Sequence, residues 1–234
     1  MLPAVSALAS LQARPTLAVE NQVTRLLQYC ARFPANSLVL RASTMQLCVQ
    51  SDASFNSRPK GRSVAGAIFY LVNQDNPGDA NGAIFAFSKL IDVVVASAGE
   101  AEYAGVFLAS CEAVNLRNML SSLGYPQTST TILCDNKFAI GLAHDTLTAK
   151  RSKSIDVKFH WIRDRVRQGQ FNLIWREGAN NLADFFTKPL PVHRHLELIP
   201  QLVQVSQQPH TYTKPQLIRK LSYLNMKTSP VPTN

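Results

Sequence analysis

Four acidic residues stand where an ordinary solvated charge would not be expected, at the ends of apolar segments or on an apolar helix face. They are Asp52 in "QSDAS", Glu102 in "SAGEAEYAG", Asp135 in "ILCDN" and Asp184 in "NNLADFF". Carboxylates brought together repel one another, and a divalent cation bound through oxygen ligands is a common way to relieve that repulsion. Four carboxylates with few neutral donors favour Mg²⁺ or Mn²⁺ over zinc.

Taken singly, three of these residues have simpler explanations. Asp135 follows a β-branched run and precedes a helical pattern, so a turn residue or a helix cap explains it as well as a ligand does. A strand-end turn explains Asp52 better than ligation, and Asp184 alone is typical of a solvated helix residue. Periodicity by itself does not show that the four carboxylates meet.

Glu100 and Glu102 cannot both point at one site, because two positions along a helix differ by about 200° in direction. The residues at helical spacing from Glu102 are all apolar and predict a face turned toward a sheet. They are Val106, Ala109, Ala113, Leu116 and Leu120. Glu100 lies three residues after Ser97, the spacing of a capping box. We therefore assign Glu100 to capping and Glu102 to chemistry.

The elements that position these residues follow from the periodicity of the apolar residues. A helix is expected between Pro15 and Pro34. Beyond it we expect strands at 45–53, 64–72, 81–88, 130–134 and 171–176, and helices at 97–123, 136–143, 154–169 and 180–188. This order predicts a mixed sheet covered by helices, whose first three strands form an antiparallel meander.

The composition favours a polyanionic partner. The chain of 234 residues has a formal net charge of +9, and a basic surface attracts phosphates over long distances. No stretch approaches the roughly 20 apolar residues that span a bilayer, so we expect no membrane partner. The four cysteines lie far apart without CxxC or CxxH spacing, which argues against a zinc site or a disulfide framework and fits a reducing compartment.

Several segments together resemble a known family. They are "SDAS", "VAGAIFYL", "SAGEAEYAG", "ILCDNKFAIGLA", "KRSKSIDVKFHWIRDRV" and "GANNLADFFTKPLP", spanning about residues 46–192. Their order and spacing are similar to the ribonuclease H domain of Ty1/copia-type retrotransposon polyproteins. The resemblance implies the α/β (α+β mixed-sheet) ribonuclease H-like fold, a five-stranded mixed sheet flanked by helices.

The resemblance also implies a site and a reaction. The family's catalytic, metal-binding carboxylates fall on Asp52, Glu102, Asp135 and Asp184, and this choice of Glu102 agrees with the apolar stripe. The implied activity is hydrolysis of the RNA strand of an RNA/DNA hybrid with two Mg²⁺ (or Mn²⁺) ions. The implied setting is intracellular, in a cytoplasmic particle or the nucleus, with an upstream reverse transcriptase domain in the parent polyprotein.

Three segments are expected on this basis. Residues 1–45 are similar to the end of a reverse transcriptase domain, residues 46–192 form the ribonuclease H-like domain, and residues 193–234 form a largely flexible tail. No Asp-Asp pair occurs, so no polymerase active site is expected in this chain. The basic stretch from Lys150 to Arg167 supplies candidates for contact with phosphates.

Two alternatives remain beside the nuclease. The chain departs from the family pattern at Ser54 and Phe55, which replace an acidic-aromatic pair, and at Ser154, which replaces a frequent histidine. A catalytically inactive, nucleic-acid-binding remnant of a truncated retroelement would keep the basic surface and lose hydrolysis. A transposase or integrase of the same broad fold usually has a final Glu after two Asp residues, and the order Asp, Glu, Asp, Asp favours the nuclease.

Overall fold

The computed structural model of the chain describes residues 1–13, 16–34, 36–76, 81–146 and 153–204. Two compact units are distinguished, one containing Pro3–Ser37 and a larger one containing Leu38–Val203. The smaller unit includes helices α1 (Leu2–Ala9) and α2 (Leu17–Arg32). The hydroxyl of Thr16 accepts the Val19 N–H at 3.3 Å and caps α2, which confirms the helix predicted between the two prolines.

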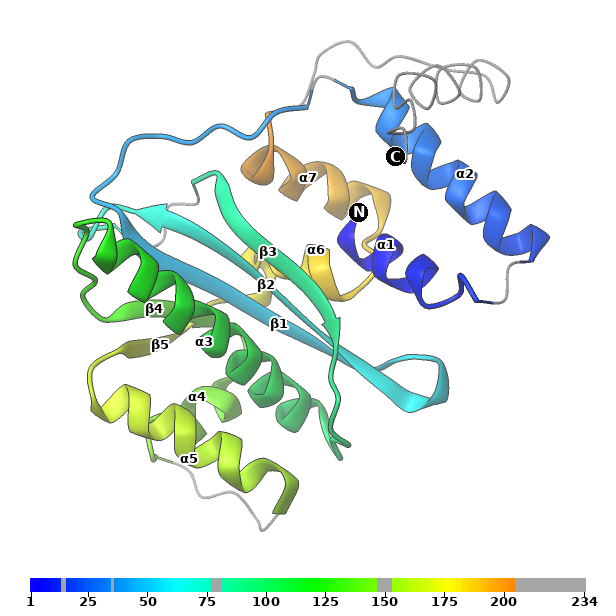
Figure 1. Cartoon of the computed structure of the whole chain (residues 1–234). Helices are drawn as coiled ribbons and strands as arrows, with labels where there is room; N and C mark the ends of the chain where they lie inside the picture. Colours follow the sequence, from blue (N-terminus) through cyan, green and yellow to red (C-terminus); the bar gives the residue numbers. More distant parts are fainter. Residues whose placement is uncertain (14–15, 35, 77–80, 147–152, 205–234) are drawn as a thin grey trace, which may run out of the picture. The chain divides into compact units, whose positions relative to one another are not determined.

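The larger unit contains one five-stranded mixed sheet. Its strands are β1 (Gln46–Arg58), β2 (Arg62–Val72), β3 (Ala83–Leu90), β4 (Thr130–Cys134) and β5 (Phe171–Trp175), in the spatial order β3-β2-β1-β4-β5. The first three strands pair antiparallel, β4 is parallel to β1, and β5 is parallel to β4 (Figure 1). This arrangement confirms the predicted sheet of a ribonuclease H-like fold.

Strand β1 is longer than predicted, and Asp52 does not end it. The antiparallel pairing with β2 continues through Asp52, which lies opposite Gly66, and on to Ser54. The parallel pairing with β4 covers only Cys48 to Gln50. The backbone of β1 therefore stays paired with β2 at Asp52, although its pairing with β4 has ended two residues earlier. Asp52 lies within β1 but just beyond the parallel β1–β4 ladder.

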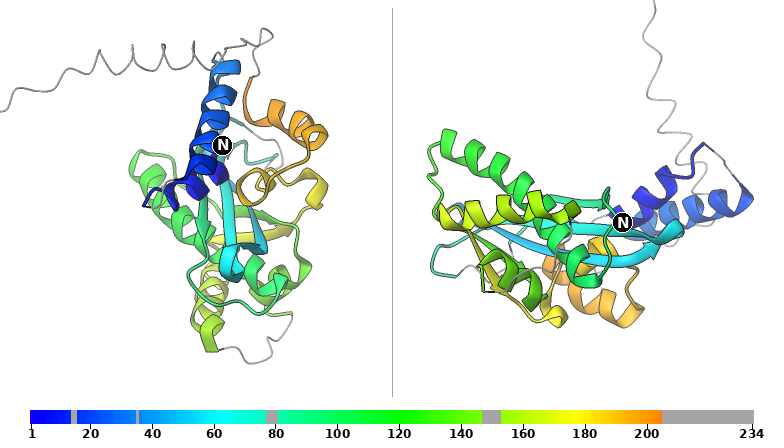
Figure 2. Two further views of the ribbon diagram at one scale, coloured as in Figure 1. Left: turned by 90° about the vertical axis from the view of Figure 1, so that its right-hand side faces the viewer. Right: turned by 90° about the horizontal axis from the view of Figure 1, so that it is seen from below.

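Helices cover both faces of the sheet. They are α3 (Ala98–Ser122), α4 (Lys137–Ala143), α5 (Lys153–Arg167), α6 (Asp184–Thr187) and α7 (Val192–Leu202), with single 3-10 turns at Pro59–Gly61 and Gly178–Asn180. Successive side chains of a strand point to opposite faces. Along β1, Leu47 and Val49 join the main core with α3, α4 and α5, whereas Cys48 faces a smaller second core. Figure 2 shows the two layers.

The second core corrects the predicted tail at 193–234. Residues 192–202 form α7 because its apolar side chains pack against the sheet: Leu198 is fully buried beside Cys48 and Ile68, and Leu202 packs on the same cluster. Residues from 205 onward lie outside the described part of the chain. The short helix predicted at 180–188 is likewise shorter in the structure, because a 3-10 turn precedes α6.

Gly66 lets α6 lie directly against the sheet beside Asp52. A Cβ atom at Gly66 would lie 2.6 Å from Cβ of Phe186 and 2.8 Å from Cγ2 of Thr187. No larger residue fits there unless α6 moves away. The absence of a side chain on β2 therefore sets how closely α6 approaches Asp52.

We expect Gly66→Ala to lower the free energy of unfolding by about 1–3 kcal/mol, the usual cost of overpacking a tight contact. Urea unfolding at neutral pH measures this change. Gly99→Ala is the matched control, because the three atoms nearest to its Cβ would all belong to the ring of Phe138, a side chain that is 40 % exposed and has solvent to move into. Equal stability of Gly66→Ala and the wild type would contradict the role given to Gly66.

Candidate active site

Asp52 is buried, with only 1 % of its surface exposed, and its polar partners come from α6 and the residue that follows it. The hydroxyl of Thr187 donates a hydrogen bond to Asp52 Oδ2. Nζ of Lys188 lies 3.7 Å from the same oxygen. A carboxylate in an apolar core is tolerated only with such partners, so α6 supplies part of what Asp52 needs.

Asp184 is placed by the segment that precedes α6. The side-chain amide of Asn181 donates to the carbonyl of Ser51 at 2.9 Å, and Gln50 Oε1 accepts the N–H of Leu182 at 2.7 Å. Both anchors lie on β1, one and two residues before Asp52. Asp184, the first residue of α6, therefore lies beside Asp52, and Lys188 Nζ is 2.7 Å from Asp184 Oδ1.

The predicted capping role of Glu100 and the predicted burial of Glu102 are confirmed, and the assignment of Glu102 to chemistry stays a prediction. Ser97 is the N-cap of α3, its hydroxyl accepts the Glu100 N–H at 3.2 Å, and Glu100 Oε2 accepts the Ala96 N–H at 2.7 Å. Glu102 is buried, with 8 % of its surface exposed, and its Oε2 has no hydrogen-bond partner in the part of the chain that the structure describes.

Asp135 is not the cap of the helix that follows it. The N-cap of α4 is Asn136, whose side-chain oxygen accepts the N–H groups of Phe138 and Ala139 at 3.0 and 3.1 Å. The side chain of the half-buried Asp135 is therefore not engaged in capping α4. Its main-chain carbonyl accepts the indole N–H of Trp175 at 3.0 Å, which fixes the backbone at the point where β4 ends.

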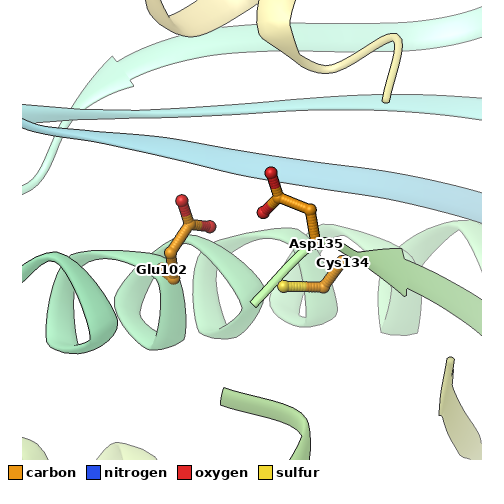
Figure 3. A group of neighbouring side chains, drawn as sticks. All are labelled: Glu102, Cys134 and Asp135. Carbon is orange, nitrogen blue, oxygen red and sulfur yellow. The ribbon is translucent and has the colours of Figure 1, made fainter. Parts of the chain in front are cut away.

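Two of these carboxylates and one thiol lie close together at the end of β4. Ligand atoms of Glu102, Cys134 and Asp135 all lie within 4.8 Å of one another, and Figure 3 shows the side chains directed toward the same volume. The strand register brings Asp52 to this point too. Gln50 lies opposite Leu133, so Asp52 and Asp135 are each two residues further along neighbouring strands.

The electrostatics of the site reflect this crowding. Burial, together with the carboxylates of Asp52 and Asp135, raises the pKa of Glu102 to about 9. Burial raises the pKa of Asp52 to about 7, although the Lys188 ammonium and the Thr187 hydroxyl lower it. Burial also raises the pKa of Asp135. The cluster is therefore short of positive charge, and without a metal ion the raised pKa favours the protonated form of Glu102 at neutral pH.

The residues present fit a hard divalent cation. The donors that converge are carboxylate oxygens, and Glu102 Oε2 is a buried oxygen with no partner among the described residues. Cys134 does not change this assignment, because burial raises the pKa of its thiol far above the ordinary value and a protonated thiol is a poor ligand. The donor set suits Mg²⁺ or Mn²⁺.

Comparison with known proteins identifies relatives of the chain. No protein-family model matches it. The chain is 33 % identical over 137 residues to the retrovirus-related Pol polyprotein from transposon TNT 1-94 of Nicotiana tabacum, covering 55 % of this chain and 10 % of that protein. It is 30 % identical over 190 residues to the Pol polyprotein from transposon RE1 of Arabidopsis thaliana, covering 80 % of this chain and 12 % of that protein.

The chain is homologous to the Pol polyproteins of Ty1/copia-type retrotransposons. It spans about a tenth of the length of these Pol polyproteins. Among solved structures, it is similar to the N-terminal RNase H domain of Rv2228c from Mycobacterium tuberculosis, solved as a fusion with maltose-binding protein. The TM-score is 0.46 at 18 % identity, covering 61 % of this chain and 91 % of that one.

Two residues that contact the carboxylates, Thr187 and Lys188, are not predicted by the sequence patterns. Both lie in the "FTKPLP" segment, whose resemblance to the family implies no role for either residue. The spacing of Lys188, four residues after Asp184, is the spacing of an ion pair along a helix and is the pattern that would have indicated it. Contact with Asp52 could not be inferred from spacing.

Some side chains of the basic stretch from Lys150 to Arg167 have a structural role. Arg163 donates to the carbonyl of Leu142 at 2.8 Å and pairs with Asp145 at 2.6 Å, and Arg167 pairs with the same carboxylate at 2.8 Å. Lys150 and Arg151 lie outside the described residues. Contact of this stretch with phosphates stays a prediction. Within the described ranges, no helix is both long and apolar enough to cross a membrane.

We expect metal-free protein to lose stability as the pH rises from about 4.5 to about 9. The folded state keeps the proton of Glu102, whose pKa is raised from 4.5 to about 9, over a range where the unfolded chain has released it. Glu102→Gln removes this linkage and should raise the free energy of unfolding at pH 8 by on the order of 1–3 kcal/mol.

Urea unfolding at pH 5 and pH 8 in the presence of a chelator measures the effect. Glu100→Gln is the matched control and should give no gain at pH 8, because the Glu100 carboxylate accepts the Ala96 N–H at the start of α3. A Glu102→Gln variant that is no more stable than the wild type at pH 8 would contradict the destabilisation assigned to ionisation of Glu102.

Proposed function

We propose that the chain is the ribonuclease H domain of a retrotransposon Pol polyprotein and hydrolyses the RNA strand of RNA/DNA hybrids. The observation that supports this most directly is the clustering of carboxylates around Glu102 Oε2, a buried oxygen that has no hydrogen-bond partner among the described residues. Homology to Ty1/copia-type Pol polyproteins gives this acidic site its chemical context.

Asp52, Glu102, Asp135 and Asp184 are the residues that would hold divalent cations. A pair of Mg²⁺ ions, when bound, supplies an activated water and stabilises the charge that develops on the leaving oxygen. The chain's own groups prepare the carboxylates for this role. Thr187 orients Asp52 through its hydroxyl, and Asn181 fixes the segment that leads to Asp184.

Glu102 has to release a proton for this function. At neutral pH its carboxyl is protonated in the metal-free site, because burial and the neighbouring carboxylates raise its pKa to about 9. A carboxylate ligand has to be deprotonated, so cation binding and proton release would be linked. Affinity for the cation is accordingly expected to increase with pH across the neutral range.

The substrate class follows from charge and from the reaction. The net charge of +9 favours a nucleic acid, whose phosphates are attracted to a basic surface. Selection of an RNA strand would rest on contacts with 2′-hydroxyl groups in the wide minor groove of the hybrid. We further propose that residues 1–45 are the end of the reverse transcriptase domain that precedes this domain in the parent polyprotein.

The test is cleavage of a labelled RNA/DNA hybrid by the purified chain with Mg²⁺. We expect cleavage of the RNA strand only, and no cleavage of duplex DNA or of free DNA strands. A chain that binds the hybrid without cutting it would instead support the inactive, nucleic-acid-binding remnant.

Asp135→Asn should reduce the cleavage rate about 100-fold or more, since a lost cation contact costs several kcal/mol in the transition state and each 1.4 kcal/mol is a factor of ten. Asp52→Asn should act in the same way. The control is Asp92→Asn, the same substitution at a side chain that is 94 % exposed and pairs with Arg62 at 3.7 Å. An unchanged rate for Asp135→Asn would remove this residue from the proposed site.

Removal of divalent cations should abolish cleavage while leaving the fold intact. Treatment with a chelator followed by dialysis is expected to reduce the rate to background, and added Mg²⁺ or Mn²⁺ should restore it because both prefer oxygen ligands. Circular dichroism before and after chelation checks that the protein stays folded. Full activity after exhaustive chelation would contradict the proposed use of the carboxylates.

A further inference from the structure

Lys188 is the cation that the chain itself brings to the carboxylate cluster. Its ammonium lies 2.7 Å from Asp184 Oδ1 and 3.7 Å from Asp52 Oδ2. In the described part of the chain, the ion pairs of Asp52 and of Asp184 are both formed with this one side chain. A single positive charge therefore lies between two carboxylates that arrive from different elements, β1 and α6.

The side chain of Lys188 is far more exposed to solvent than those of its two partners. The side chain of Lys188 is 42 % exposed, while those of Asp52 and Asp184 are 1 % and 12 % exposed. Asp52 is held by the Thr187 hydroxyl, and Asp184 follows a segment anchored to β1 through Asn181. A lysine has four rotatable carbons between its backbone and its charge, so the ammonium can reach solvent without any movement of the backbone.

The single charge of Lys188 only partly balances the cluster. Glu102 and Asp135 also face this space, and no ion pair of either is formed among the described residues. A divalent cation bound between the carboxylates would offer more charge at the same place and would repel the ammonium. Lysine and cation cannot both occupy the space between Asp52 and Asp184.

We propose that Lys188 is a built-in counter-ion that occupies the site in the metal-free protein and is displaced when a divalent cation binds. This inference rests on the proposed function, because it concerns the same carboxylates. The ammonium holds Asp52 and Asp184 together before the cation arrives, and the free energy of breaking its ion pairs lowers the affinity for the cation.

Substitution of Lys188 separates these two effects. We expect Lys188→Met to bind Mn²⁺ about fivefold more tightly than the wild type, which corresponds to about 1 kcal/mol, in the range of a partly exposed ion pair. The same variant should unfold at a lower temperature without metal, and Mn²⁺ should raise its unfolding temperature by more than it raises that of the wild type.

Titration calorimetry with Mn²⁺ alone and thermal unfolding with and without Mn²⁺ provide both readouts without any nucleic acid. Lys188→Arg retains the charge and should stay close to the wild type, and Lys188→Gln provides a second neutral variant. Lys89→Met is the matched control, because Lys89 forms a 2.7 Å ion pair with Glu112 away from the carboxylate cluster. Its Mn²⁺ affinity should equal that of the wild type.

The outcomes are distinguishable. If the wild type binds Mn²⁺ and both neutral variants bind it equally or more weakly, the displacement of Lys188 is overturned while the proposed metal site stands. If the wild type binds no Mn²⁺ at all, the proposed function fails at its metal site and the displacement fails with it. Tighter binding by both neutral variants, but not by Lys188→Arg or Lys89→Met, supports the proposal.

Discussion

Mutual repulsion of buried carboxylates is the constraint around which the larger unit is organised. Asp52 and Glu102 are almost fully buried; Asp52 and Asp135 raise the pKa of Glu102, and Asp184 and Asp135 raise that of Asp52. Such an arrangement is unfavourable for folding, because desolvated charges without partners cost far more than a typical hydrogen bond returns. The surrounding apolar packing has to exceed that cost, and a sheet with a core on each face provides the packing.

Close backbone approaches direct that packing toward the site. Gly66 brings α6 onto β2, and a Cβ at Gly105 would lie 3.3 Å from Cβ of Ala53 and from the Asp52 carbonyl, so α3 lies close to β1. A Cβ at Gly178 would lie 2.7 Å from Asp135 Oδ2, which allows the 3-10 turn to pass beside that carboxylate. Helix α3 and the segment from Gly178 to α6, distant from each other in sequence, thereby both approach the neighbouring strands β1 and β4 beside the carboxylates.

Local patterns were sufficient where a residue's role depends on its own element. The stripe of α3 distinguished Glu102 from Glu100, and β-branched runs located the strands. Asp135 and Asn136 are both capping residue types, and only the backbone conformation at the end of β4 decides that Asn136 caps α4. Thr187 meets Asp52 across 135 positions of sequence. That contact depends on docking of α6, which no local pattern encodes.

Because the two hydrophobic cores differ in size, the two layers that form the site are expected to differ in stability. Asp184, Thr187 and Lys188 belong to α6 or border it, and the layer of α6 and α7 is fastened by the smaller core and by the polar anchors of Gln50. Local opening of that layer requires less apolar surface to be exposed than unfolding of the sheet with α3. Partial opening of this layer would therefore remove Asp184 from the site, together with the partners that Thr187 and Lys188 give to Asp52, while the main sheet stays intact.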